Sequence, residues 1–191
     1  MPRSPNGWVP DDGARAGKTL ARRRSGQTMT NARDTAGVIA PPPLIALAVV
    51  VIGLALDWLL PGYGLRALLT LTLRIAIGVM LMGAGVVLAV AGERRFHSVG
   101  TEVKPWKPST ILVTDGVFRW VRNPMYVGLT AFLAGLAVML ASDWMLVTTV
   151  AFVLVIHFGV VRREERYLEA KFGDAYRTYK AQVPRYGWPP V

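Results

Sequence analysis

The sequence predicts an all-α polytopic membrane protein with four transmembrane helices, the last two forming a short helical hairpin, and a cytoplasmic helical segment at the C-terminus. Apolar residues make up 52% of the 191 residues and are gathered in blocks. Four of these blocks approach the ~20 residues that a helix needs to cross the hydrocarbon core of a bilayer. The lysines and arginines, which bring the formal charge to +10, lie between the blocks. This separation excludes an ordinary soluble domain.

The chain divides into a tail and a membrane domain. Residues 1–37 are rich in Gly, Pro, Arg and Asp and lack apolar periodicity, which predicts a disordered basic tail. Residues 38–191 form the predicted membrane domain. Ser142-Asp143-Trp144 is the only polar break between the last two apolar blocks, so these two helices are expected to turn back tightly on each other. The expected spans are about 41–60, 67–91, 125–142 and 144–161.

The distribution of positive charge predicts how the helices are oriented. Nearly all lysines and arginines lie in the tail, in the loop 92–124 and in the C-terminal segment 162–191, whereas the turn 61–66 has only Arg66. By the positive-inside rule both termini and the long loop are cytoplasmic, and we expect an integral protein of the inner membrane. Basic residues that flank apolar spans indicate contact with anionic membrane lipid and not with nucleic acid.

The residue types present limit the chemistry. The chain has no cysteine, which excludes disulfides, thiolate metal sites and cysteine nucleophiles. His97 and His157 are its two histidines, and two histidines alone do not make a convincing metal site, so no metal is expected. Any chemistry therefore uses a borrowed cofactor, carboxylates, arginines or hydroxyl groups.

Asn123-Pro124 predicts the start of the third span. Asparagine can accept hydrogen bonds from the free amides of the first turn, and proline at the next position has no amide to leave unbonded. The helix then presents free N–H groups and partial positive charge at the cytoplasmic border, with Arg119 and Arg122 just before it. This combination favours a carboxylate or phosphate site. The alternative is a capped helix whose arginines rest on lipid headgroups.

A pair of glutamates follows the fourth span. Continued helix separates the side chains of Glu164 and Glu165 by about 100°, so the two residues are expected to do different jobs. His157 lies seven residues before Glu164 and therefore on the same face of a regular helix. This favours Glu164 as the glutamate that faces a pocket. The alternative for His157 is that it only satisfies a neighbouring polar group.

Several motifs, taken in order, resemble the isoprenylcysteine carboxyl methyltransferase and phospholipid methyltransferase family of integral membrane enzymes. The resemblance covers roughly residues 67–186. It rests on Leu112-Val113-Thr114-Asp115-Gly116, Arg122-Asn123-Pro124-Met125-Tyr126-Val127-Gly128, Glu164-Glu165, Phe172-Gly173, Tyr176 and Val183-Pro184-Arg185.

The resemblance implies methyl transfer from S-adenosyl-L-methionine at the cytoplasmic membrane face. The implied partner is a lipophilic or lipid-modified acceptor in the membrane, with a prenylcysteine-type carboxylate, a lipid amine or another lipid carboxylate. Together with the helix start and the helix face described above, it gives catalytic roles to Glu164 and Arg122. The expected cofactor-binding residues are Phe118, Arg119, Trp120, Val121, Asn123, Pro124, Tyr126, Gly128, His157 and Glu165.

Two departures from the family pattern leave the acceptor open. Asn123 stands where eukaryotic prenylcysteine enzymes tend to have histidine, and Val160 stands where they place an arginine one turn before the first glutamate. If neither Arg162 nor Arg163 compensates, the sequence does not support recognition of a prenylcysteine carboxylate, and an amine, a thiol or another lipid carboxylate is the alternative acceptor. Two alternative functions are a nicotinamide-dependent membrane reductase, and a non-enzymatic scaffold subunit whose basic loops bind lipid headgroups.

Overall fold

The computed structural model describes residues 36–98 and 111–187. The predicted tail therefore lies almost entirely outside the described residues, as do part of the predicted cytoplasmic loop, 99–110, and the last four residues, 188–191. All regular secondary structure in the described ranges is helical, which confirms the predicted all-α class.

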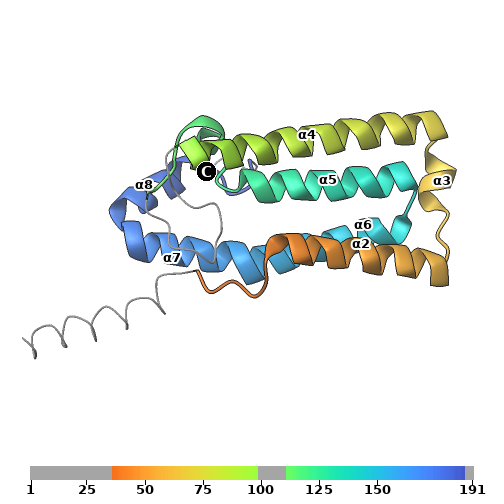
Figure 1. The fold of residues 1–191 in the computed structure, drawn as a ribbon, viewed down its shortest axis with the longest axis horizontal. Helices are drawn as coiled ribbons and strands as arrows, with labels where there is room; N and C mark the ends of the chain where they lie inside the picture. The colour runs from red at the N-terminus through yellow and green to blue at the C-terminus, as the bar shows by residue number, and fades with distance from the viewer. Residues whose placement is uncertain (1–35, 99–110, 188–191) are drawn as a thin grey trace, which may run out of the picture. The chain divides into compact units, whose positions relative to one another are not determined.

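Four long helices carry most of the apolar sequence (Figure 1). They are α2 (Pro42–Leu59), α4 (Leu71–Ser98), α5 (Pro124–Leu140) and α6 (Asp143–Ile156). A short helix, α3 (Gly64–Leu68), joins α2 to α4 in place of the predicted simple turn. The predicted second span therefore begins later than expected, and its helix runs further, to Ser98.

The helix that starts with α6 continues well beyond the apolar block. A π-helical turn, η2 (His157–Val161), connects α6 to α7 (Arg162–Phe172). The three segments form one continuous helix whose apolar part ends at Val161, before the charged sequence of α7. After Gly173, which has a positive φ of 55°, the chain turns into α8 (Asp174–Gln182).

Three of the described helices are long and apolar enough to cross a membrane. They are Pro42–Leu59, Leu71–Ser98 and the continuous helix Asp143–Phe172. Helix α5 is apolar but has only 17 residues, fewer than the ~20 that a perpendicular span needs. The structure thus supports an integral membrane protein, and the count of four spans remains a prediction.

Helices α4 and α5 lie side by side along their length (Figure 1) because glycines let their backbones approach. A Cβ atom on Gly85 would lie 2.4 Å from the carbonyl oxygen of Gly128, and one on Gly135 would lie 2.7 Å from that of Gly78. Such distances leave no space for a side chain. Gly128 thus serves close helix packing in this structure.

Polar residues tie the helices together at the end of the bundle near α3. Ser142 accepts a hydrogen bond of 3.0 Å from the amide of Met145 and so caps α6, and its hydroxyl donates to Asp57 of α2. Asp143 accepts hydrogen bonds from the amides of Gly64 and Leu65, at 2.7 and 2.9 Å. The predicted polar break is therefore the point where α2, α3 and α6 are joined.

The opposite end of the bundle is built around the loop before α5. This loop contains the 3-10 turn η1 (Gly116–Arg119), and α8 packs on it through a buried aromatic cluster. The Tyr179 hydroxyl donates a hydrogen bond of 2.8 Å to the carbonyl oxygen of Phe118. The amide of Arg122 donates to the carbonyl oxygen of Pro184 at 3.0 Å. These contacts hold the start of α5 against the C-terminal residues.

Candidate functional site

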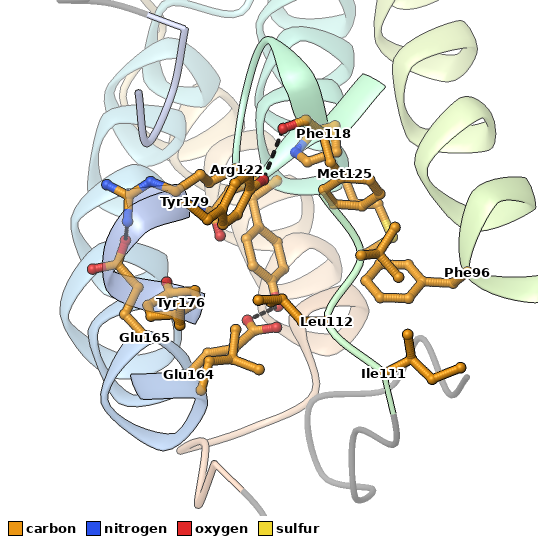
Figure 2. Close-up of a pocket in the computed structure, with 15 residues that line it drawn as sticks. Phe96, Ile111, Leu112, Phe118, Arg122, Met125, Glu164, Glu165, Tyr176 and Tyr179 are labelled. Atoms are coloured by element: carbon orange, nitrogen blue, oxygen red, sulfur yellow. Dashed lines mark hydrogen bonds and ion pairs between the residues drawn. The ribbon is translucent and has the colours of Figure 1, made fainter. Parts of the chain in front are cut away.

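A cavity of about 50 Å³ lies where the start of α5 meets α7 and α8 (Figure 2). One part of its lining is apolar or aromatic, and another carries the charged residues Arg122, Glu164 and Glu165. The remaining lining residues are Phe96, Ile111, Leu112, Val113, Phe118, Asn123, Pro124, Met125, Tyr126, Leu168, Tyr176 and Tyr179.

Tyr126 of α5 and Glu164 of α7 meet in this cavity although they lie 38 positions apart in the sequence. The tyrosine hydroxyl donates a hydrogen bond of 3.1 Å to Oε2 of Glu164. The structure therefore brings the two predicted stretches, the start of the third apolar helix and the glutamate pair, to one place.

Partial burial makes Glu164 an unusual carboxyl group. It lies beyond the apolar part of its helix, which ends at Val161. Loss of hydration raises the pKa of Glu164 to about 7; the hydrogen bond from Tyr126 opposes this rise, and the neighbouring charge of Glu165 adds to it. Near neutral pH, Glu164 is therefore poised between its protonated and ionised forms.

Glu165 faces a different environment from its neighbour. Arg185 donates to both of its carboxylate oxygens, from Nε at 2.8 Å and from Nη2 at 2.7 Å. Nη1 of Arg122 also lies 3.0 Å from Oε1 of Glu165. The Glu165 side chain is only 9% exposed, so its charge is neutralised inside the protein by guanidinium groups.

Arg122 keeps unused hydrogen-bonding capacity. Its side chain is 9% exposed, yet its Nε and Nη1 atoms are buried and donate no hydrogen bond to any described residue. The N–H bonds of Nη1 are therefore not directed at Glu165, in spite of the short distance. Buried donors without acceptors are costly, and such atoms often mark a place where a ligand binds.

The aromatic residues near these charges are also perturbed by burial. Loss of hydration raises the pKa of Tyr176 to about 12, and the nearby Glu165 adds to this effect while Arg122 opposes it. Burial likewise raises the pKa of Tyr179, so both tyrosines stay neutral at physiological pH. They form a neutral aromatic wall next to Arg122 (Figure 2).

Three other predicted residues line the cavity, but one of them makes a different contact from the one predicted. Phe118, Asn123 and Pro124 line the cavity. Asn123 does not cap α5 as predicted, because its side-chain amide instead donates a hydrogen bond of 3.1 Å to the carbonyl oxygen of Arg185. Proline does begin the helix, as expected.

Five predicted residues lie outside the cavity lining, and one of them is Gly128, which packs against α4. Arg119 and Trp120 are exposed, the latter to 78%, and Val121 is buried without reaching the cavity. His157 pairs with Tyr186, its Nδ1 lying 2.9 Å from the hydroxyl. The predicted shared face of His157 with Glu164 assumed a regular α-helix, and the π turn between them interrupts that periodicity.

Sequence reasoning gave no role to several residues that the structure brings into the site. Six of them are apolar lining residues: Phe96, Ile111, Leu112, Val113, Met125 and Leu168. The other three are polar or charged. Tyr176 and Tyr179 line the cavity, and Arg185 binds Glu165. Tyr176 and Arg185 belong to the motifs quoted for the resemblance, so that pattern was a signal for them. Tyr179 follows Tyr176 by three residues on α8 and so lies on the same helix face.

Comparison with known proteins supports the resemblance to membrane methyltransferases. The sequence matches the phospholipid methyltransferase family over residues 73–175. It is 39% identical over 77 residues to the protein-S-isoprenylcysteine O-methyltransferase of Schizosaccharomyces pombe. The aligned residues are 39% of this chain and 31% of that protein. It is 36% identical over 76 residues to protein-S-isoprenylcysteine O-methyltransferase B of Arabidopsis thaliana, covering 38% and 37%.

A third relative is an uncharacterized protein of Haemophilus influenzae, 40% identical over 62 residues, which are 32% of this chain and 98% of that protein. The alignments with the two named enzymes thus span about a third of their lengths. The family match, by contrast, covers more than half of this chain. This protein therefore belongs to the phospholipid methyltransferase family.

Proposed function

We propose that this protein transfers a methyl group from S-adenosyl-L-methionine to a lipophilic acceptor at the cytoplasmic face of the membrane. The observation that carries this proposal is that a guanidinium with unused donors and a carboxyl group without a cationic partner among the described residues line the same cavity. Arg122 offers buried donors that have no acceptor among the described residues, and Glu164 offers a half-buried carboxyl group whose one hydrogen bond among those residues comes from a neutral tyrosine. Such a site suits a zwitterion that also carries a positive charge on sulfur.

The residues fit the charges of the cofactor. Arg122 and the amino end of α5 are suited to its carboxylate, and ionised Glu164 is suited to its ammonium or sulfonium. When bound, the cofactor supplies an electrophilic methyl group on a positively charged sulfur. A cavity of about 50 Å³ is much smaller than the ~300–1,000 Å³ of typical small-molecule pockets, so the lining side chains must move apart on binding.

The apolar lining has a separate task. Phe96, Leu112 and Met125 provide a surface that holds a lipophilic acceptor and excludes water from the reacting atoms. For an amine acceptor, a bond forms between nitrogen and the methyl carbon as the bond from that carbon to sulfur breaks. The nitrogen, bound as the neutral amine, keeps its protons and becomes a methylated ammonium, so the step needs no further base and ionised Glu164 stays paired with the cofactor.

The structure favours a lipid amine over a prenylcysteine carboxylate as the acceptor. Val160 is buried, Arg162 lies over the ring of Phe158, and Arg163 donates to the carbonyl oxygen of Gly37 at 2.8 Å. Arg122 is the only arginine or lysine among the described residues that line the cavity. If it holds the cofactor's carboxylate, those residues leave no second cation for an anionic acceptor.

The proposed placement in the membrane completes this function. We propose four spans, with α5 as the third, and both termini on the cytoplasmic side of the inner membrane. The apolar sequence of α5 and its two-residue connection to α6 support the short hairpin. This orientation opens the cavity to the cytoplasm, where the cofactor is found.

Cofactor binding is tested by titrating the full chain in nanodiscs with S-adenosylhomocysteine. We expect saturable binding that weakens about tenfold or more in Tyr126→Phe and in Glu164→Ala, as expected when a hydrogen bond to a charged group is lost. Tyr63→Phe is a matched control, because Tyr63 is exposed at the other end of the bundle. Absence of saturable binding to the wild-type protein would reject the cofactor proposal.

The acceptor is tested with methyl-labelled cofactor. Phosphatidylethanolamine and a farnesylated cysteine analogue are offered separately, and we expect label in the amine. Label only in the farnesylated acceptor would contradict the amine assignment while leaving methyl transfer intact. Displacement of bound ligand by a nicotinamide nucleotide, with no methyl transfer, would instead favour the reductase alternative. Retention of function in Arg122→Lys would favour a scaffold, because lysine lacks the guanidinium fork.

A further inference from the structure

Four consecutive residues near the C-terminus, Val183–Tyr186, reach back to the candidate site. We call this segment the C-terminal strap. The carbonyl oxygen of Pro184 accepts from the amide of Arg122, and that of Arg185 accepts from the side chain of Asn123. Tyr186 pairs with His157. The strap therefore contacts the start of α5 and the helix that carries the glutamates.

Within the strap, Arg185 makes the strongest ionic contact. Its Nε and Nη2 atoms bind the two oxygens of Glu165 in the parallel geometry that gives the strongest arginine–carboxylate pairs. Glu165 in turn raises the pKa of Arg185 further above its ordinary value, so the guanidinium remains charged. Both oxygens of Glu165 are thus already occupied.

Two arginines share one carboxylate in this arrangement. Glu165 carries one negative charge, whereas Arg122 and Arg185 carry two positive charges, which leaves one positive charge unbalanced within this triad. Because Arg185 takes both carboxylate oxygens, the surplus charge lies on Arg122. The Nε and Nη1 atoms of Arg122 donate to no described residue, so their hydrogen-bonding capacity is available to a ligand.

We propose that Arg185 is a positioning residue that neutralises Glu165 and thereby keeps Arg122 free to bind the carboxylate of the cofactor. This inference rests on the proposed function. Without Arg185, Arg122 is the nearest replacement, since its Nη1 already lies 3.0 Å from Oε1 of Glu165. Arg122 then turns to Glu165, which keeps the buried carboxylate paired but removes the anion site.

The test compares two probes that differ by a single group. S-adenosylhomocysteine carries the carboxylate, and its decarboxylated analogue lacks only that group. In Arg185→Met, we expect the dissociation constant of S-adenosylhomocysteine to rise about tenfold, as for one lost hydrogen bond to a charged group. The analogue's dissociation constant stays within about twofold of its wild-type value, because it makes no use of Arg122.

A second substitution restores binding if the reasoning is right. Arg185→Met combined with Glu165→Gln removes the charge that competes for Arg122, so the affinity for S-adenosylhomocysteine returns to within about threefold of wild type. Arg177→Met is the matched control, because Arg177 also pairs with a glutamate, Glu169, but on the exposed side of α8. Arg177→Met should leave the dissociation constants of both S-adenosylhomocysteine and its decarboxylated analogue unchanged.

The outcomes separate this inference from the function on which it rests. Equal losses for the two probes in Arg185→Met, or no rescue by Glu165→Gln, would mean that Arg185 supports only the fold. If Arg185→Met does not fold, Arg185→Lys provides the same comparison, with a selective loss of about threefold because one of two contacts remains. A wild-type protein that binds neither probe would refute the cofactor proposal itself, and this inference with it.

Discussion

The ionisation of Glu164 should control how tightly the protein binds S-adenosylhomocysteine. A carboxyl group attracts the ligand's ammonium only when it is ionised, so the apparent affinity is scaled by the ionised fraction. With a pKa of about 7 for Glu164, that fraction is roughly 0.1 at about pH 6 and roughly 0.9 at about pH 8. The apparent dissociation constant should therefore fall about tenfold between these two pH values.

Calorimetric titration of the full chain in nanodiscs measures this change. Glu164→Gln should bind weakly at both pH values, because a neutral amide does not attract the ligand's ammonium and does not change its charge with pH. Glu169→Gln is the matched control: Glu169 also lies on α7, but it binds Lys180, which lowers its pKa, and it does not line the cavity. This variant should keep the tenfold change.

The pH range of the change in affinity distinguishes Glu164 from other titrating groups. The pKa of Asp115 is lowered by Arg95, and that of Tyr176 is raised to about 12, so neither changes charge in this range. A histidine can titrate near neutral pH, so His157→Gln is included and should also keep the tenfold change. An affinity that is constant from about pH 6 to about pH 8, or the same change in Glu164→Gln, would refute the reasoning.

Two predictions concern the stability of the helical bundle. Gly128→Ala should lower the free energy of unfolding by about 1–3 kcal/mol, because its new methyl group would meet the carbonyl oxygen of Gly85 at 2.5 Å. At Gly83, no described atom outside the adjoining part of its own helix lies within 4 Å of an added methyl group, so Gly83→Ala should be neutral or stabilising. Thermal unfolding measures both variants, and equal losses would contradict close packing at Gly128. Ser142→Ala should cost about 1 kcal/mol through loss of the cap on α6, which chemical unfolding in detergent measures. Unchanged stability would mean that the capping bond to the Met145 amide contributes nothing.

Local sequence signals located the helices but not every side-chain contact. Proline at position 124 begins α5, as predicted, because its missing amide hydrogen costs nothing in the first turn. Asn123 was expected to cap that helix, yet it donates to Arg185, which lies 62 residues further along the chain. A cap is predictable from neighbouring residues, whereas a competing partner from the distant C-terminus is not.

The π turn explains a second difference between expectation and structure. A seven-residue separation predicts a shared face only if the helix is regular, and His157–Val161 has the wider π geometry. The residue types in this turn carry no clear signal for it. Gly159 is nevertheless informative, because a Cβ atom there would lie 2.4 Å from the side chain of Ile39. The turn is thus packed against the residues that precede α2.

The two adjacent glutamates illustrate how position and environment divide their roles. Their divergence on the helix was predictable, and it directs Glu164 to the hydroxyl of Tyr126 and Glu165 to Arg122 and Arg185. The carboxylate that meets two arginines has its charge balanced inside the protein. The one whose partner among the described residues is a neutral hydroxyl stays costly to ionise until a cationic ligand arrives. A pair of identical residues therefore supplies one structural anchor and one binding group, and the choice between them is made by partners that lie far away in the sequence.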